Sequence, residues 1–175
     1  MVIELDSPSS RRTFAIGREL GTTLAGREIV LLHGGLGAGK TLFTQGLASG
    51  MGLDPDDIVS PTFTLMNVHR RPVSSADSSE SSPPHDVTLL HVDCYRLGLE
   101  ESRDSRRLIL PELDEWLGSA VIVVEWAQYL DPSYDDLEGA IRVDLQVRGE
   151  ERRRIRIEGS LSERAAQALR GVVDK

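Results

Sequence analysis

The chain has 175 residues, 39% of them hydrophobic, and a formal charge of -8 at neutral pH. This length favours one domain, residues 1–175, that is large enough to bury a single core. The acidic balance argues against a strong, autonomous nucleic-acid binder, because neutralising phosphates requires clustered lysine and arginine. It leaves open an acidic protein that reaches RNA through another protein.

The sequence also limits where the protein works. Cys94 is the only cysteine, which excludes an internal disulfide and a cysteine-based zinc cluster and fits a reducing compartment. The longest apolar runs, residues 29–32 and 120–124, are far shorter than a membrane span. The first residues lack the charged start and long apolar core of a signal peptide. We therefore expect a cytoplasmic protein.

In the first half of the chain, strand and helix patterns alternate around a glycine-rich loop. Residues 28–33 are an apolar run typical of a buried strand, and residues 40–52 repeat apolar side chains at helical spacing. Phe63, Leu65 and Asn67 alternate with their neighbours at a period of two, which predicts a strand through this stretch. The expected elements are a strand at 2–5, a helix at 7–24, a strand at 28–33, a helix at 40–52, a turn at 54–57 and a strand in the second half of 58–69.

The second half adds further strands and a segment of unusual composition. Residues 72–86 are rich in serine, proline and acidic residues without an apolar period, so we predict a disordered loop insertion between two strands. The remaining expected elements are strands at 87–95 and 119–126, a mostly helical stretch at 98–118 with Pro111 opening its second part, a strand pair at 140–147 and 152–159, and a helix at 160–173.

Residues 34–41, GGLGAGKT, satisfy the pattern G-x-x-x-x-G-K-[ST] in full. From composition alone, a match in a chain of this length has a chance on the order of one in a hundred. Here a strand precedes the motif and a helix follows it. The alternative is a glycine-rich turn with an exposed lysine.

Glycines let successive backbone N–H groups turn around an anion at the positive end of the following helix. We therefore interpret residues 34–41 as the phosphate cradle of a nucleoside triphosphate site, the P-loop. Lys40 should reach the β- and γ-phosphates, and Thr41 should bind Mg²⁺. The candidate nucleotide contacts are Gly34, Gly35, Leu36, Gly37, Ala38, Gly39, Lys40, Thr41 and Leu42. The whole pattern predicts an α/β, P-loop NTPase-like three-layer domain with a mixed, mainly parallel sheet and antiparallel additions.

A P-loop needs a carboxylate at the end of a neighbouring strand to hold the metal. Glu125 follows the run 120–124, and Asp93 follows the run 89–92. We expect Glu125 to hold Mg²⁺ and Asp93 to hold its water shell or orient the attacking water, the alternative for each being a strand-end acid facing solvent. Thr62, after Ser60 and Pro61, either senses the γ-phosphate as a switch loop does or belongs to an ordinary turn. The candidate catalytic residues are Lys40, Asp93, Glu125 and Thr62, and the candidate metal ligands are Thr41, Glu125 and Asp93.

Histidines and arginine clusters are weaker signals. The four histidines lack the spacing of a metal site, and we expect them at strand ends or in loops. Residues 152–154 predict a strand flank with outward charges, with a nucleotide or RNA contact as the lesser alternative. Residues 102–107 predict a solvated helix face, with an arginine-bearing lid as the lesser alternative.

The sequence also bears on which class of P-loop protein this is. An N-K-x-D guanine motif is absent from the sequence, so ATP is favoured over GTP. The length also permits a small-molecule or nucleoside kinase, which would need an acceptor pocket. A third alternative is a nucleotide-sensing interaction module, in which ATP orders residues 60–62 for a partner.

Four stretches together resemble the TsaE family, the ATPase of bacterial tRNA threonylcarbamoyladenosine biosynthesis. The stretches are 34–52, 59–69, 91–97 and 121–126, in the family's order and spacing. The resemblance extends from about Thr13 to Arg154. It implies a protein that binds Mg-ATP, hydrolyses it slowly alone, and works with TsaD and TsaB. Those partners transfer a threonylcarbamoyl group to N6 of adenosine 37 in tRNAs that read ANN codons, so the ATPase meets tRNA only through the complex.

The resemblance also assigns residues and shows departures. It implies a switch-like loop at residues 60–62, a D-x-Y-R motif made by Asp93, Tyr95 and Arg96, and a Thr13 that lies near the base. Three residues depart from the family: Gly35 replaces a common Asp, Leu42 replaces a common Thr or Ser, and Gln128 follows EWA where EWP and an acid are usual. Without a hydroxyl at position 42, a possible α-phosphate bond worth about 1 kcal/mol net is lost.

Overall fold

The computed structural model describes residues 1–71, 87–99 and 111–173. The predicted insertion at 72–86 and the arginine-bearing stretch at 102–107 lie outside the described residues. Within those residues, none of the helices combines the length and the apolar character that crossing a membrane requires.

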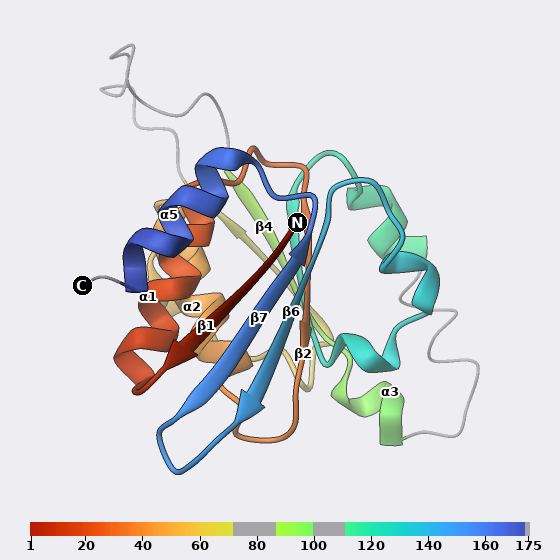
Figure 1. Ribbon diagram of the computed structural model, residues 1–175. Helices are drawn as coiled ribbons and strands as arrows, with labels where there is room; N and C mark the ends of the chain where they lie inside the picture. The colour runs from red at the N-terminus through yellow and green to blue at the C-terminus, as the bar shows by residue number, and fades with distance from the viewer. Residues whose placement is uncertain (72–86, 100–110, 174–175) are drawn as a thin grey trace.

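One seven-stranded sheet forms the centre of the protein (Figure 1), in the order β1-β7-β6-β2-β5-β4-β3. The pairs β2–β6, β2–β5 and β4–β5 are parallel, and the pairs β1–β7, β6–β7 and β3–β4 are antiparallel. Five strands therefore point one way, with β3 and β7 opposed to them, which confirms the predicted mixed, mainly parallel sheet. The strands are β1 (Val2–Ser7), β2 (Ile29–His33), β3 (Met66–Arg70), β4 (Thr88–Asp93), β5 (Val121–Glu125), β6 (Ala140–Val147) and β7 (Arg153–Gly159).

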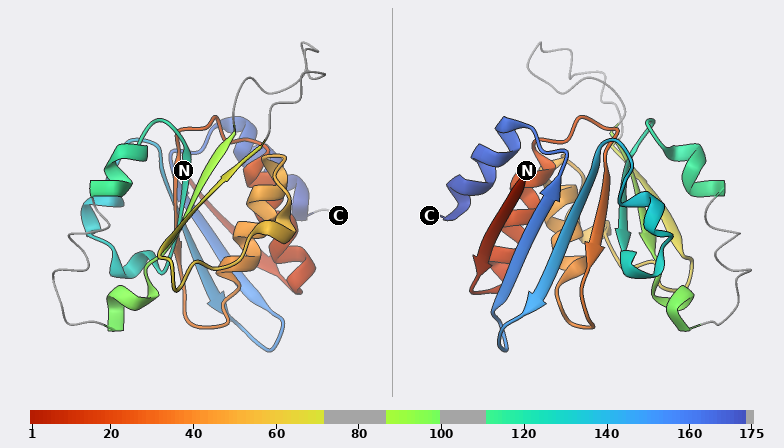
Figure 2. Two further views of the ribbon diagram at one scale, coloured as in Figure 1. Left: turned by 180° about the vertical axis from the view of Figure 1, so that it is seen from behind. Right: turned by 45° about the vertical axis from the view of Figure 1, so that its right-hand side comes forward.

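Helices cover both faces of this sheet, which confirms the three-layer prediction (Figure 2). On one face lie α1 (Ser10–Gly21), α2 (Lys40–Gly50) and α5 (Glu163–Val173); on the other lie α3 (Tyr95–Leu99), a helical turn at 111–116, and the 3₁₀ helices η2 (Ala127–Tyr129) and η3 (Pro132–Tyr134). A further 3₁₀ helix, η1 (Pro55–Asp57), follows α2 at the predicted turn. All residues of β2 and β5 are buried, as expected for parallel strands covered on both faces.

Two predicted elements differ from the structure. The strand predicted through residues 62–65 is wrong, because residues 62–64 form a turn and Leu65 has a positive φ of 67°. The backbone N–H of Leu65 donates to the carbonyl oxygen of Pro61 at 2.6 Å and closes that turn. Phe63 is 88% exposed, so the alternating pattern does not bury a strand face here. The strand predicted at 87–95 ends at Asp93, and a helix begins at Tyr95.

Close packing of α1 on α2 fixes the start of α2. Gly17 and Gly21 on α1 face α2, and Gly46 and Gly50 on α2 face α1. A Cβ at any of the four would lie between 2.1 and 2.3 Å from a carbonyl oxygen of the facing helix. The two backbones can therefore meet only because these positions lack side chains. The N-terminal turn of α2, which follows the P-loop directly, is held in place by this contact.

Candidate nucleotide-binding site

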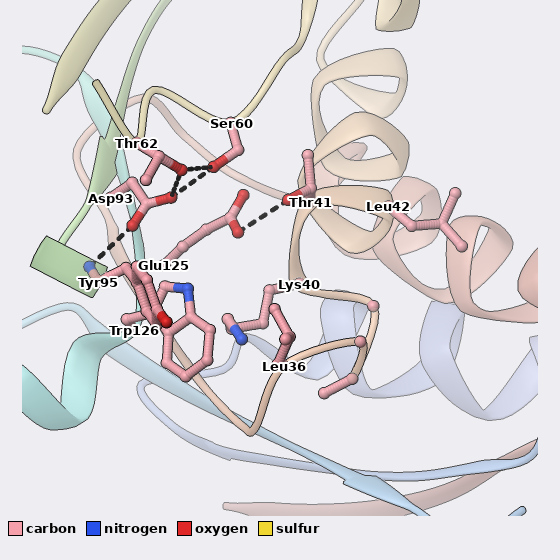
Figure 3. A pocket seen from close by; sticks show the side chains of 13 residues that line it. Leu36, Lys40, Thr41, Leu42, Ser60, Thr62, Asp93, Tyr95, Glu125 and Trp126 are labelled. Atoms are coloured by element: carbon pink, nitrogen blue, oxygen red, sulfur yellow. Dashed lines mark hydrogen bonds between the residues drawn. The ribbon is translucent and has the colours of Figure 1, made fainter. Parts of the chain in front are cut away.

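The carboxyl ends of β2, β4 and β5 meet at one edge of the sheet, beside the N-terminus of α2. In the sheet register, Glu125 lies opposite Leu32 on one side and Asp93 on the other. A cavity of about 490 Å³ opens there (Figure 3). It is lined by Leu36, Gly37, Ala38, Gly39, Lys40, Thr41, Leu42, Ser60, Thr62, Asp93, Tyr95, Glu125 and Trp126. The structure thus brings together the P-loop, both predicted acids and the predicted switch-like loop.

The P-loop has the backbone of an anion cradle. Gly37 and Gly39 have φ values of 71° and 99°, in the left-handed region that favours glycine. Gly39 is the N-cap of α2 and has no side chain that could cap this helix. The first N–H groups of α2 point to where an anion would lie, at the positive end of the helix dipole.

Lys40 is folded back into the loop. Its Nζ donates to the carbonyl oxygens of Gly34 and Gly35, each at 2.9 Å, and lies 3.4 Å from the centre of the Trp126 ring. Only 5% of Lys40 is exposed. Burial lowers the pKa of its ammonium. The negative charges of Glu125 and Asp93 oppose this shift. A phosphate that displaced the two carbonyls would relieve part of this desolvation through charge-assisted bonds.

Thr41, Glu125 and His91 form a chain of hydrogen bonds that runs from the cavity wall into the buried interior. The Thr41 hydroxyl donates to Oε2 of Glu125 at 2.9 Å, and Nε2 of His91 lies 2.8 Å from Oε1. Because a carboxylate can only accept, Nε2 of His91 carries the proton. His91 is fully buried and Glu125 is 2% exposed. The bond from the histidine therefore fixes the carboxylate of Glu125, which Figure 3 shows bonded to Thr41.

Asp93 holds the Ser60–Thr62 loop. Its Oδ2 accepts from the hydroxyls of Ser60 and of Thr62, the latter at 2.8 Å, and its Oδ1 accepts from the backbone N–H of Tyr95 at 2.8 Å. The Ser60 and Thr62 hydroxyl oxygens also lie 2.9 Å apart, and because each hydroxyl has one hydrogen, two of these three contacts can be donated at one time. Both carboxylates therefore accept from protein donors, Asp93 from the Ser60–Thr62 loop and Tyr95, and Glu125 from His91 and from Thr41 at the end of the P-loop.

The oxygen donors next to the P-loop fit a Mg²⁺ ion whose other ligands are phosphates and waters. They do not form a site in which protein side chains alone would surround a metal. Among the residues that the structure describes, no group of three or more His, Cys, Asp or Glu side chains could hold a metal ion. Mg²⁺ in phosphate-transfer sites is held by few protein oxygens together with waters and phosphates. The hydroxyl of Thr41 and the carboxylate of Glu125 supply such oxygens next to the cradle.

Some predicted contacts lie at the margin of the cavity. Thr13 is 2% exposed, its hydroxyl bonds that of Ser7 at 2.8 Å, and it lies beneath Gly39. Its proximity to the base stays a prediction. Gly34 and Gly35 sit at the entry of the loop and bind Lys40 through their carbonyls. The side chain of Leu42 points away from the carboxylates (Figure 3).

Sequence reasoning missed three residues at the site. His91 was expected at a strand end, but it lies inside β4, and the H-x-D spacing that puts it on the face of Asp93 was the available signal. Trp126, directly after Glu125, has a positive φ of 58° and packs on Tyr95 with ring centres 4.8 Å apart. Arg153 donates to P-loop carbonyls, although outward charges were expected for this cluster.

Comparison with known proteins decides the family. A sequence model described as "Threonylcarbamoyl adenosine biosynthesis protein TsaE" matches residues 7–155. The chain belongs to the TsaE family. The resemblance found in the sequence is thereby confirmed, and the family's name links it to tRNA threonylcarbamoyladenosine biosynthesis.

Relatives in the TsaE family span most of the chain. The TsaE protein of Streptomyces coelicolor is 37% identical over 157 residues, which cover 87% of this chain and 93% of that protein. The TsaE protein of Aquifex aeolicus is 29% identical over 152 residues, covering 85% and 90% of the two chains. The structure described as "Crystal structure of Bacillus subtilus YdiB" covers 98% of this chain and 94% of its own with a TM-score of 0.62. At 21% identity it supports the fold alone.

Proposed function

We propose that the protein is a Mg²⁺-dependent ATPase required for threonylcarbamoyl modification of N6 of adenosine 37 in tRNAs that read ANN codons. The observation that carries this proposal is the bond from Thr41 to Glu125 beside the buried ammonium of Lys40. A hydroxyl, a carboxylate and an ammonium at one helix N-terminus are the donor set of a Mg-nucleoside triphosphate site. Membership of the TsaE family supports the part of the proposal that concerns tRNA.

Binding would rest on Lys40, Thr41 and Glu125. Lys40 would exchange the P-loop carbonyls for β- and γ-phosphate oxygens, because an ammonium binds phosphate more strongly than a neutral carbonyl. Thr41 and Glu125 would hold Mg²⁺, with His91 keeping the carboxylate in place. When bound, the metal neutralises charge that develops on the phosphates.

Hydrolysis would rest on Asp93 and the loop that it holds. Its carboxylate would orient the attacking water or the water shell of the metal. Thr62, bonded to Asp93 in this structure, would exchange that bond for a contact with the γ-phosphate. The loop would thereby report the presence of the triphosphate.

The proposal assigns the protein to the cytoplasm, with TsaD and TsaB as partners. It does not make the chain the transferase. The formal charge of -8 supports contact with tRNA through those partners rather than directly, because tRNA is a polyanion. ATP is the substrate, and Mg²⁺ is the metal.

The direct test is Mg-ATP hydrolysis by the purified chain, measured as released phosphate. We expect slow turnover that falls by on the order of a hundredfold in Lys40→Ala, with an unfolding curve that shows an intact fold. The matched control is Arg154→Gln, an exposed change of one positive charge away from the cavity. An unchanged rate in Lys40→Ala would refute the P-loop assignment.

A small-molecule kinase would give a different product in the same assay. Labelled ATP would then yield a phosphorylated metabolite in place of inorganic phosphate. We expect inorganic phosphate only.

A further inference from the structure

The outer side of the P-loop is bound by an arginine that is distant in sequence. Arg153 is the first residue of β7, and its Nε donates to the carbonyl oxygen of Ala38 at 3.1 Å. Its Nη2 donates to the carbonyl oxygen of Gly37 at 2.9 Å. The remaining nitrogen, Nη1, directs its two hydrogens at three carbonyls of the turn between β6 and β7, those of Gly149, Glu150 and Arg152, so that one hydrogen is shared. One guanidinium thus ties the P-loop to this turn.

These contacts constrain how the loop presents its N–H groups. In a trans peptide the C=O and the N–H point in opposite directions. When Arg153 holds the carbonyls of Gly37 and Ala38 outward, the N–H groups of Ala38 and Gly39 face into the cradle. The Ala38 N–H makes a long bond of 3.3 Å to the carbonyl oxygen of Gly35 across the loop, which agrees with this direction.

Arg153 also brings positive charge to the cradle. Arg153 carries a positive charge, and its five hydrogen bonds within the described residues go to backbone carbonyls. No ion pair engages Arg153 within residues 1–71, 87–99 and 111–173. The charge therefore remains available to favour an anion on the far side of the loop.

The next arginine in the sequence, Arg154, makes different contacts. Side chains alternate between the faces of a strand, so Arg154 points away from Arg153. Arg154 lies 3.7 Å from the carboxylate of Asp6, and its side chain is 47% exposed. Position 153 is thus the arginine of this pair that reaches the P-loop.

We propose that Arg153 is a positioning residue for the nucleotide: it holds the P-loop from behind so that the N–H groups of residues 38 and 39 are aligned for the phosphates. This inference rests on the proposed function of the same site. It also makes the β6–β7 turn part of the binding apparatus, because one guanidinium joins the two segments.

The test measures the Kd of Mg-ATP and Mg-ADP by titration calorimetry for wild type, Arg153→Gln, Arg153→Lys and Arg154→Gln. We expect Arg153→Gln to weaken both nucleotides about tenfold, since it removes two charge-assisted bonds and one charge. Arg153→Lys keeps the charge but not the planar fork, so we expect a loss of about threefold, and this variant serves if Arg153→Gln does not fold. Arg154→Gln should match wild type.

The readouts separate positioning from stability. A merely structural role would lower the melting temperature or the binding stoichiometry and leave the Kd of the folded protein unchanged. If wild type binds and the folded Arg153 variants have its Kd, this inference is refuted and the proposed function stands. If wild type and all variants fail to bind Mg-ATP, the proposed function is refuted together with this inference.

Discussion

Substituting Gly46 by alanine should force α1 and α2 apart. The new Cβ would lie 2.1 Å from the carbonyl oxygen of Phe14 and 3.1 Å from the backbone N of Arg18. Both obstacles are backbone atoms of a helix, so no flexible side chain can move out of the way. The helices must separate by roughly 1 Å to restore an ordinary contact, which disturbs a close-packed interior.

The expected cost follows from two opposing effects. Alanine in place of glycine favours a helix by about 1 kcal/mol. Overpacking a rigid contact costs about 3 kcal/mol, the upper end of its usual range, because the backbone itself must shift. We therefore expect Gly46→Ala to lower the free energy of unfolding by about 2 kcal/mol, or the melting temperature by about 4–8 °C for a chain of this size.

Gly171→Ala in α5 is the matched control. Outside the backbone of α5 itself, no atom of the described residues lies within 4 Å of a Cβ at Gly171, so the helix preference acts there alone and we expect a gain of about 0.5–1 kcal/mol. Urea unfolding followed by circular dichroism measures both variants. Because α2 begins at Lys40, Gly46→Ala should also weaken Mg-ATP binding. Equal or greater stability of Gly46→Ala relative to Gly171→Ala would refute the proposed packing.

Two further predictions concern the acids and a histidine. Glu125→Gln should raise the Mg²⁺ concentration for half-maximal ATP hydrolysis more than Asp93→Asn, because Glu125 faces Thr41; the reverse order would make Asp93 the principal metal ligand. Burial, reinforced by Arg142, lowers the pKa of His33 in the folded state. The unfolded chain then binds this proton more readily, so stability is lost as the pH falls below about 6.5. Between pH 7.5 and pH 5.5, the urea midpoint of unfolding should fall less in His33→Gln than in wild type. An equal fall in the two proteins would show that His33 is not the source of this pH dependence.

The strand, glycine-rich loop and helix around residues 34–41 could be predicted from the sequence because that motif is local. Residues 34–41 carry their own backbone requirements, and the strand before and helix after them follow from apolar periodicity. The antiparallel pair β6–β7 could also be predicted from the sequence, because a short polar turn joins two strand patterns. Glu125 and Asp93 were identified as strand-end acids by the same reasoning.

Contacts between distant residues could not be predicted in this way. Arg153 meets Ala38 across 115 positions, and that contact depends on the strand order that places β6 next to β2 and β7 next to β6. His91 meets Glu125 because β4 and β5 are neighbours in parallel register. At residues 62–65 the alternating pattern failed, because the bond from Thr62 to Asp93 and the turn at Pro61 override local periodicity.

The most direct test of the account is ATP hydrolysis by the purified chain, alone and with TsaB and TsaD of the same organism, with tRNA modification followed in parallel. The account predicts slow hydrolysis alone, a higher rate with both partners, and loss of hydrolysis and of threonylcarbamoyladenosine formation in Lys40→Ala. ATP binding without any response to TsaB and TsaD, and full modification with Lys40→Ala, would contradict it.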